Sequence, residues 1–272
     1  MLTKCFVVAL AAVGCSISLY SQAKPSAPNV NEIISHLEAN PGDFPWILEL
    51  GRYGKDDPRI IPLLKTMFAT EQSEPTRPLP DPANISHLRK SQYIAVALIK
   101  LGVSDSIYLD ELSRHVQSAL ASDPPDAFQD IPGNPKAIVR NPEFESWCAV
   151  RGGDLHACSG TVTDYWGDLF ALLSVHDPRS IPILRAALNA KSSVFVERAA
   201  GELARLEGSR ALPIIERTCE RLSAKRSEAI ILEAANHIRG DEMNRLVDRF
   251  VHDPLAKEWV RKRTATRQAP GR

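Results

Sequence analysis

The stretch Asp-Pro-Arg-Ile-Ile-Pro-Leu-Leu at 57–64 returns as Asp-Pro-Arg-Ser-Ile-Pro-Ile-Leu at 177–184. In both copies an aspartate and a proline stand where an apolar helical pattern begins. Aspartate is a favoured N-cap, and proline suits the first helical turn because its missing N–H has no intrahelical acceptor there. The recurrence predicts a chain built from repeated helical units.

A regular period supports this prediction in the C-terminal half. Ser-Ile-Pro-Ile-Leu at 180–184 is echoed thirty-one residues later by Ala-Leu-Pro-Ile-Ile at 211–215, and more faintly by Asn-Arg-Leu-Val at 244–247. This spacing fits one helical hairpin per repeat. Between the first two copies, apolar residues recur at three- and four-residue steps over 194–206, which indicates the second helix of the pair.

The repeat has a family resemblance. The phrase Val-x-Arg-Ala-Ala-x-x-Leu-x-x-Leu at 196–206, taken with the Asp-Pro-Arg phrase, resembles the HEAT-like repeats named for phycobilin lyases. In those repeats a proline-containing first helix precedes an alanine-rich second helix. The resemblance is clearest over 177–240, and Arg198 stands where the family often has its second-helix arginine. It implies an all-α fold, a right-handed α-solenoid.

Extending the two-helix template predicts about six helical pairs in one elongated, curved domain over 24–272, because each pair buries its apolar face against its neighbours. The first helices are expected at 30–38, 58–68, 107–120, 178–190, 210–224 and 241–252. Their partners are expected at 45–53, 86–101, 162–176, 194–206, 227–238 and 254–267.

Two neighbouring repeats carry insertions. The steps from Asp57 to Asp105 and from Asp105 to Asp177 both exceed the thirty-one-residue period. The excess falls between the first and second helices, as inserted loops at 69–85 and 121–160. Stacking should bring the two loops together on one edge of the solenoid. Binding faces of solenoids often collect such insertions, so this edge is the expected place for specificity.

The longer insertion contains the candidate contact residues Phe128, Phe144 and Trp147, and Trp166 follows in the next expected helix. These aromatics have two interpretations. They fasten the insertion to the solenoid, or some remain exposed as a contact site, since tryptophan and tyrosine dominate binding hot spots.

Asp154 and His156 are the residues of the sequence that most resemble a catalytic or metal-binding motif. An Asp-x-His pair supports a metal ion or a general base only with a third ligand, such as His115 or Glu145, close by. One pair is weak evidence. We therefore predict no catalytic residue, metal or cofactor, and retain Asp154 and His156 only as weak binding candidates.

The first 23 residues predict export. Lys4 precedes an apolar run, and Ser-Gln-Ala at 21–23 suits cleavage after Ala23. Glycine and serine interrupt the run, whereas a membrane span needs about 20 apolar residues. Ala-Val-Gly-Cys at 12–15 approximates a lipobox, so acylation of Cys15 and a membrane-surface tether stay open. We expect a periplasmic or extracellular protein, lipid-anchored if Cys15 is acylated.

Cleavage would leave three cysteines. Cys148 and Cys158 flank a short turn-forming segment and are expected to form a disulfide, which closes the small loop. Cys219 lies on the apolar face of an expected helix and is predicted to be a buried packing residue.

The chain of 272 residues has a formal net charge of zero, which provides no cationic footprint for generic nucleic-acid binding. We therefore expect an exported HEAT-repeat scaffold that mediates protein–protein interaction in the cell envelope, with specificity supplied by the disulfide-closed insertion and with an unidentified protein partner. The alternative is a lyase- or chaperone-like enzyme that holds a substrate in the concave face. This alternative rests on fold-level analogy.

Overall fold

The computed structural model describes residues 29–75, 88–131, 134–151 and 153–265. Over these residues the chain is predominantly helical, which confirms the all-α prediction at the level of fold class. The described part also contains a small antiparallel sheet of β1 (Phe128–Ile131) and β2 (Asn134–Arg140). The expected export segment and Cys15 lie outside the described residues. None of the described helices combines the length and the apolar character needed to cross a membrane.

Helices occur in each of the expected pairs. The first helices are α1 (Val30–Ala39), α3 (Ile60–Ser73), α5 (Ser106–Ser122), α8 (Ile181–Ala187), α10 (Leu212–Cys219) and α12 (Asp241–Phe250). Their partners are α2 (Pro45–Tyr53), α4 (Lys90–Lys100), α7 (Leu155–Ser174), α9 (Ser193–Glu207), α11 (Ala224–Ala234) and α13 (Pro254–Ala265). Short 3-10 turns, η1 (Pro178–Ser180) and η2 (Gly208–Ala211), lead into α8 and α10.

The repeated Asp-Pro-Arg phrase forms the same local structure twice. Arg59 and Arg179 each donate backbone and side-chain hydrogen bonds to the aspartate two residues earlier, Asp57 and Asp177. These bonds from Arg59 hold the pKa of Asp57 at about 2. Each arginine also reaches the preceding pair: Arg59 Nη2 donates to Asn31 Oδ1 in α1 at 2.9 Å, and Arg179 Nη1 donates to the carbonyl of Ser104, in the segment that leads into α5, at 3.0 Å. The phrase therefore begins one helical pair and also fastens it to the pair before.

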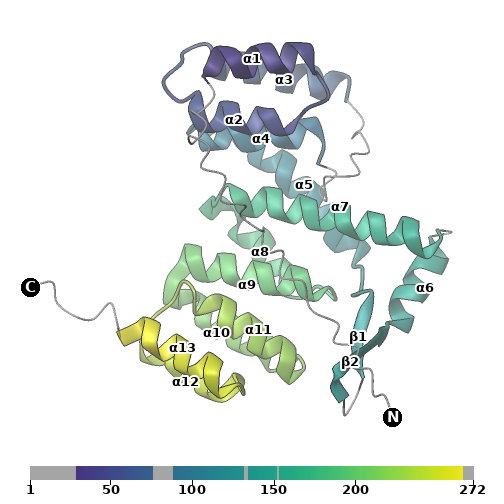
Figure 1. Ribbon diagram of the computed structural model, residues 1–272, viewed down its shortest axis with the longest axis vertical. Helices are drawn as coiled ribbons and strands as arrows, with labels where there is room; N and C mark the ends of the chain where they lie inside the picture. The colour runs from purple at the N-terminus through teal and green to yellow at the C-terminus, as the bar shows by residue number, and fades with distance from the viewer. Residues whose placement is uncertain (1–28, 76–87, 132–133, 152, 266–272) are drawn as a thin grey trace, which may run out of the picture.

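The helices pack in the order of the sequence. Each first helix contacts its partner; α5, for example, contacts α7. The second helices also contact one another in sequence: α2 contacts α4, α4 contacts α7, α7 contacts α9, and α9 contacts α11. Figure 1 shows this succession along the long axis of the molecule, from α1 at one end to α12 and α13 at the other. One buried apolar core extends through these helices, from Ile33 in α1 to Val260 in α13.

The expected loop at 121–160 is largely ordered secondary structure, which corrects the prediction. It contains the β1–β2 hairpin, helix α6 (Pro142–Val150) and the first turns of α7, which begins at Leu155 rather than near Val162. The N-cap side chains explain both helix starts: Asn141 accepts a hydrogen bond from Glu143 N, and Asp154 accepts one from Ala157 N. The shorter expected insertion, 69–85, overlaps the end of α3, and its residues 76–85 lie outside the described part of the chain.

Candidate functional site

Most of the predicted aromatic contact residues belong to a small core that joins the insertion to α7. Phe144 is only 2% exposed and packs with Cys148, Cys158 and Val162, while Trp147 and Trp166 lie against this cluster. Trp147 Nε1 donates to the carbonyl of Ser122 at 2.9 Å. The structure therefore places Phe144, Trp147 and Trp166 as residues that fasten the insertion, the first of the two interpretations above.

Cys148 and Cys158 have their sulfur atoms at disulfide distance, with Cα atoms 5.8 Å apart. The pair connects α6 to α7, so it constrains packing between two helices and does not simply close a loop. Cys219 is a buried free thiol, as expected from its place on the apolar face of α10. Burial raises the pKa of this thiol to about 12, which removes it from thiolate chemistry at neutral pH.

Asp154 has a structural role. Its carboxylate caps α7 by accepting a hydrogen bond from Ala157 N at 2.8 Å. The side chain of His156 lies outside the described atoms. Of the two third ligands considered, His115 contacts Glu111, at 3.2 Å, and Glu145 contacts Arg140, at 3.9 Å. Nowhere in the described ranges do three His, Cys, Asp or Glu side chains gather as metal ligands do.

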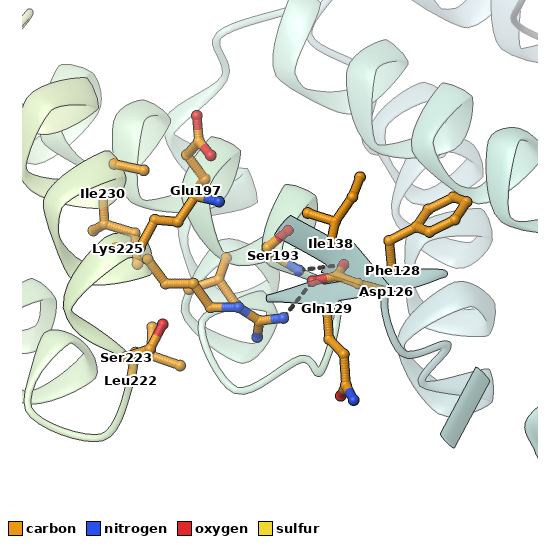
Figure 2. A pocket seen from close by; sticks show the side chains of 13 residues that line it. Asp126, Phe128, Gln129, Ile138, Ser193, Glu197, Leu222, Ser223, Lys225 and Ile230 are labelled. Atoms are coloured by element: carbon orange, nitrogen blue, oxygen red, sulfur yellow. Dashed lines mark hydrogen bonds and ion pairs between the residues drawn. The ribbon is translucent and has the colours of Figure 1, made fainter. Parts of the chain in front are cut away.

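Phe128 differs from the other candidates because it is exposed. Its side chain is 55% exposed on β1, and Ile138 on β2 is 62% exposed. The two residues form the hairpin side of a cavity of about 560 Å³. Val196 and Glu197 of α9 and Ile230 of α11 contribute to the opposite side (Figure 2). Both the volume and the mixture of apolar and polar lining are typical of ligand-binding clefts.

Asp126, two residues before the first residue of β1, positions the hairpin at this cavity. Its Oδ1 accepts a hydrogen bond from the backbone N–H of Ser193 at 2.8 Å, at the start of α9, and its carboxylate forms an ion pair with Arg226 of α11 (Figure 2). The Asp126 carbonyl accepts a hydrogen bond from Asn141 Nδ2 at 2.8 Å, at the far end of the hairpin. One residue thus connects both stems of the hairpin to both helices of the opposite wall.

Asp123 and Lys191 add a second attachment. Asp123 Oδ1 accepts a hydrogen bond from Lys191 N at 2.9 Å, and the Lys191 ammonium reaches Glu143 in α6. Arg226 Nη1 also donates to the Lys191 carbonyl, at 3.3 Å. Ion pairs and backbone hydrogen bonds therefore dock the insertion on α9, α11 and the Lys191 segment. The apolar side chains of Phe128 and Ile138 take no part in these bonds and line the cavity.

Glu197 gives the cavity wall an acidic group. Burial raises the pKa of its carboxyl; Arg198 opposes that rise, and Glu233 adds to it. In the part of the chain that the structure describes, the Glu197 carboxylate has no ion-pair partner within 4 Å. The cavity therefore presents a half-buried carboxylate beside apolar side chains.

Sequence reasoning missed Asp126, Glu197 and Arg226. The ion pair between Asp126 and Arg226 joins residues 100 positions apart, and neither residue belongs to a recognisable motif. Glu197 falls within the Val-x-Arg-Ala-Ala phrase, where periodicity marks its neighbours as core without indicating a cavity. The available signal was only that Glu197 falls between the apolar positions of the helical period over 194–206.

Comparisons of this chain with protein-family models, with curated proteins and with solved structures give no match. The geometry of the hairpin cavity is therefore the basis of the functional proposal.

Proposed function

We propose that this protein is an exported scaffold, a right-handed α-solenoid of HEAT-like pairs, which binds a protein partner in the cell envelope through its inserted hairpin. The observation that carries the proposal is the exposure of Phe128 and Ile138 at the cavity, where both large apolar side chains are more than half exposed. Exposed apolar surface rimmed by polar groups is typical of protein interaction sites.

The contrast within the insertion supports this assignment. Phe144 is buried, so it contributes to stability, whereas Phe128 is 55% exposed to solvent at the cavity. Asp126 holds the hairpin at both stems, which gives the exposed residues a fixed position before any partner binds. A preorganised contact surface loses less conformational entropy on association.

A second candidate, the lyase- or chaperone-like enzyme, has one observation in its favour. Glu197 is half-buried and its pKa is raised by burial, and perturbed carboxyl groups in clefts are enriched at functional sites. The other acidic group of the cavity, Asp126, is occupied by Ser193 N and Arg226. Glu233, the carboxyl neighbour that also raises the Glu197 pKa, lies 3.5 Å from Arg198. The carboxylates around Glu197 are thus engaged in structural contacts, so the scaffold remains our proposal.

Photocrosslinking tests the scaffold proposal. A benzophenone amino acid replaces Phe128 in the cavity, and in a matched variant it replaces Val150, which is 86% exposed on α6 but does not line the cavity. After irradiation of the native envelope fraction, we expect a discrete crosslinked protein from position 128 and none from position 150. Equal crosslinking from both positions, or none from position 128, would contradict a docking site at the hairpin.

The proposed export has its own test. Mass spectrometry of the protein purified from its native host is expected to find Lys24 as the mature N-terminus, or an acylated Cys15 if the protein is membrane-tethered. An intact cytoplasmic chain that begins at Met1 would contradict the proposed location.

A further inference from the structure

A second cavity continues the hairpin cavity along the same helices. It measures about 460 Å³ and is lined by Leu232 and Asn236 of α11 and by Ala256 and Trp259 of α13. The two cavities share Glu197 of α9 and Ala229 of α11. They therefore adjoin along α9 and α11, and together we call them the groove, with the hairpin at one end and α13 at the other; Figure 1 shows α9 and α11 between these two elements.

Both ends of this groove are apolar and held in place. At the hairpin end stand Phe128 and Ile138. At the other end Trp259 is 44% exposed, and Arg263 lies over its ring at 4.5 Å while also donating to Asn236 Oδ1 at 2.6 Å. Each end thus offers an aromatic side chain: Trp259 lies under Arg263, and Phe128 stands on the strand that follows the docked Asp126.

The middle of the groove is acidic. Glu197 lies where the two cavities meet, and Glu233 lines the second cavity. Nearby cations have other partners: Arg226 pairs with Asp126, and Arg198 lies 3.5 Å from Glu233. Lys225 also lines this wall (Figure 2) and is engaged in an interaction of its own. Arg198 lowers the pKa of Glu197 by its charge without forming a direct ion pair with it, so within the described residues a cation on the occupant would be the direct ion-pair partner of this carboxylate.

Burial makes that complementarity stronger than it would be at an open surface. A carboxylate that is partly removed from water has a raised pKa because its charged form is poorly solvated, and a hydrogen-bonded cation restores that solvation. Glu197 meets this condition through burial and through the neighbouring Glu233.

Resting on the proposed function, we propose that the groove binds an extended polypeptide segment in which a lysine or arginine side chain, seated against Glu197, is flanked by apolar side chains. One apolar side chain enters the cavity beside Phe128, and the other enters the cavity beside Trp259. An elongated groove with apolar ends and a central anion suits an extended chain because its side chains reach separate pockets in succession.

Peptide selection on the purified, oxidised full-length protein tests this inference. A phage library of random dodecapeptides is the probe, and the binding of selected peptides is then measured for the wild type, Glu197→Gln, Phe128→Ser and Glu242→Gln. Glu242 is an exposed residue in the first turn of α12, outside the groove, so Glu242→Gln is the matched charge control.

We expect enriched peptides with a basic residue between apolar residues. Loss of a charge-assisted hydrogen bond should make Glu197→Gln bind them about tenfold more weakly. Phe128→Ser should also bind them more weakly, while Glu242→Gln should bind as the wild type does. Enriched peptides that lack a basic residue but depend on Phe128 would overturn this inference and leave the hairpin site standing. If the selected peptides bind Phe128→Ser and Glu197→Gln as tightly as the wild type, or if no peptide is enriched, both this inference and the proposed hairpin site would be overturned.

Discussion

Arg226 in α11 forms an ion pair with Asp126, a residue 100 positions earlier that begins the inserted hairpin. The Asp126 side chain is 14% exposed, and its carboxylate also accepts a hydrogen bond from the N–H of Ser193, at the start of α9. A carboxylate at a helix N-terminus is favoured by the helix dipole. Helices α9 and α11 thereby hold the inserted hairpin.

Replacing Arg226 with methionine should loosen the hairpin. The change leaves the largely buried Asp126 carboxylate without its cation, at a cost of about 2 kcal/mol, while methionine keeps much of the apolar stem. We expect faster amide exchange and faster proteolysis within 126–140 and little change in total helix content. Arg217→Met, at an exposed position of α10, is the control and should leave exchange of the hairpin unchanged. An equally protected hairpin in both variants would show that Arg226 does not hold it.

Close packing of the second helices depends on Gly51. A Cβ atom at this position of α2 would lie 2.8 Å from the Ala97 Cα in α4, so Gly51→Ala must push the two helices apart. Such overpacking should lower the free energy of unfolding by about 2 kcal/mol. Gly160→Ala, in α7, is the opposite control because nothing lies within 4 Å of its added Cβ. In that variant the free energy of unfolding should rise by about 0.5–1 kcal/mol, because alanine has a higher helix propensity than glycine. Thermal denaturation measures both changes: the melting temperature should fall for Gly51→Ala and rise for Gly160→Ala, relative to the wild type.

The buried Glu111 carboxylate should make the protein sensitive to acid. Burial raises the pKa of Glu111, but hydrogen bonds from His115, Ser91 and Arg114 outweigh burial and bring the pKa well below its usual range. Because the folded-state pKa is lowered, the stabilisation is fully present above the unfolded-state pKa of about 4.3 and is lost as pH falls towards the folded-state pKa.

Glu111→Gln should therefore be less stable than the wild type by about 2 kcal/mol at neutral pH, and the difference should shrink below about pH 4. Urea denaturation at several pH values measures this, with Glu38→Gln, an exposed change on α1, as the control. The comparison with wild type also removes the contribution of Asp168, whose pKa burial raises and whose effect on stability has the opposite sign. A constant difference at all pH values would contradict the role given to the Glu111 charge.

The cysteines should separate into two chemical classes. Iodoacetamide at mildly alkaline pH is expected to leave Cys219 unmodified in the folded protein, since burial raises its pKa to about 12, and to modify it once urea is added. Non-reducing peptide mapping should recover Cys148 linked to Cys158. Rapid labelling of native Cys219, or recovery of Cys219 in the disulfide, would contradict this assignment.

Local signals in the sequence predict most of the helices. The proline and the apolar spacing at 45–53 give both ends of α2 correctly, and the pattern over 194–206 gives α9 to within a residue at each end. These features are determined by neighbours in sequence: a cap, a proline and a helical period. The same signals were present at Asn141-Pro142 and Asp154, where the absence of the repeat pattern hid the starts of α6 and α7.

The candidate site was less accessible to sequence analysis because it depends on distant contacts. Phe128 and Phe144 are equally apolar and lie in the same insertion, yet one is exposed and the other is buried. Phe144 packs with Cys148, Cys158 and Val162, whereas Phe128 belongs to the hairpin that Asp126 docks on Arg226, and no local pattern encodes either set of contacts. The sequence therefore located the inserted segment but could not tell which of its aromatic side chains is exposed.

Hydrogen exchange of the full-length protein, with and without the partner isolated through the crosslink at position 128, tests the central claim most directly. A partner docked at the hairpin should slow exchange within 126–140 and in the first turns of α9 and α11, while α1 and α3, at the far end of the molecule, exchange as before (Figure 1). Slower exchange confined to α1–α5, with the hairpin and α9 unchanged, would contradict the claim that the inserted hairpin is the binding site.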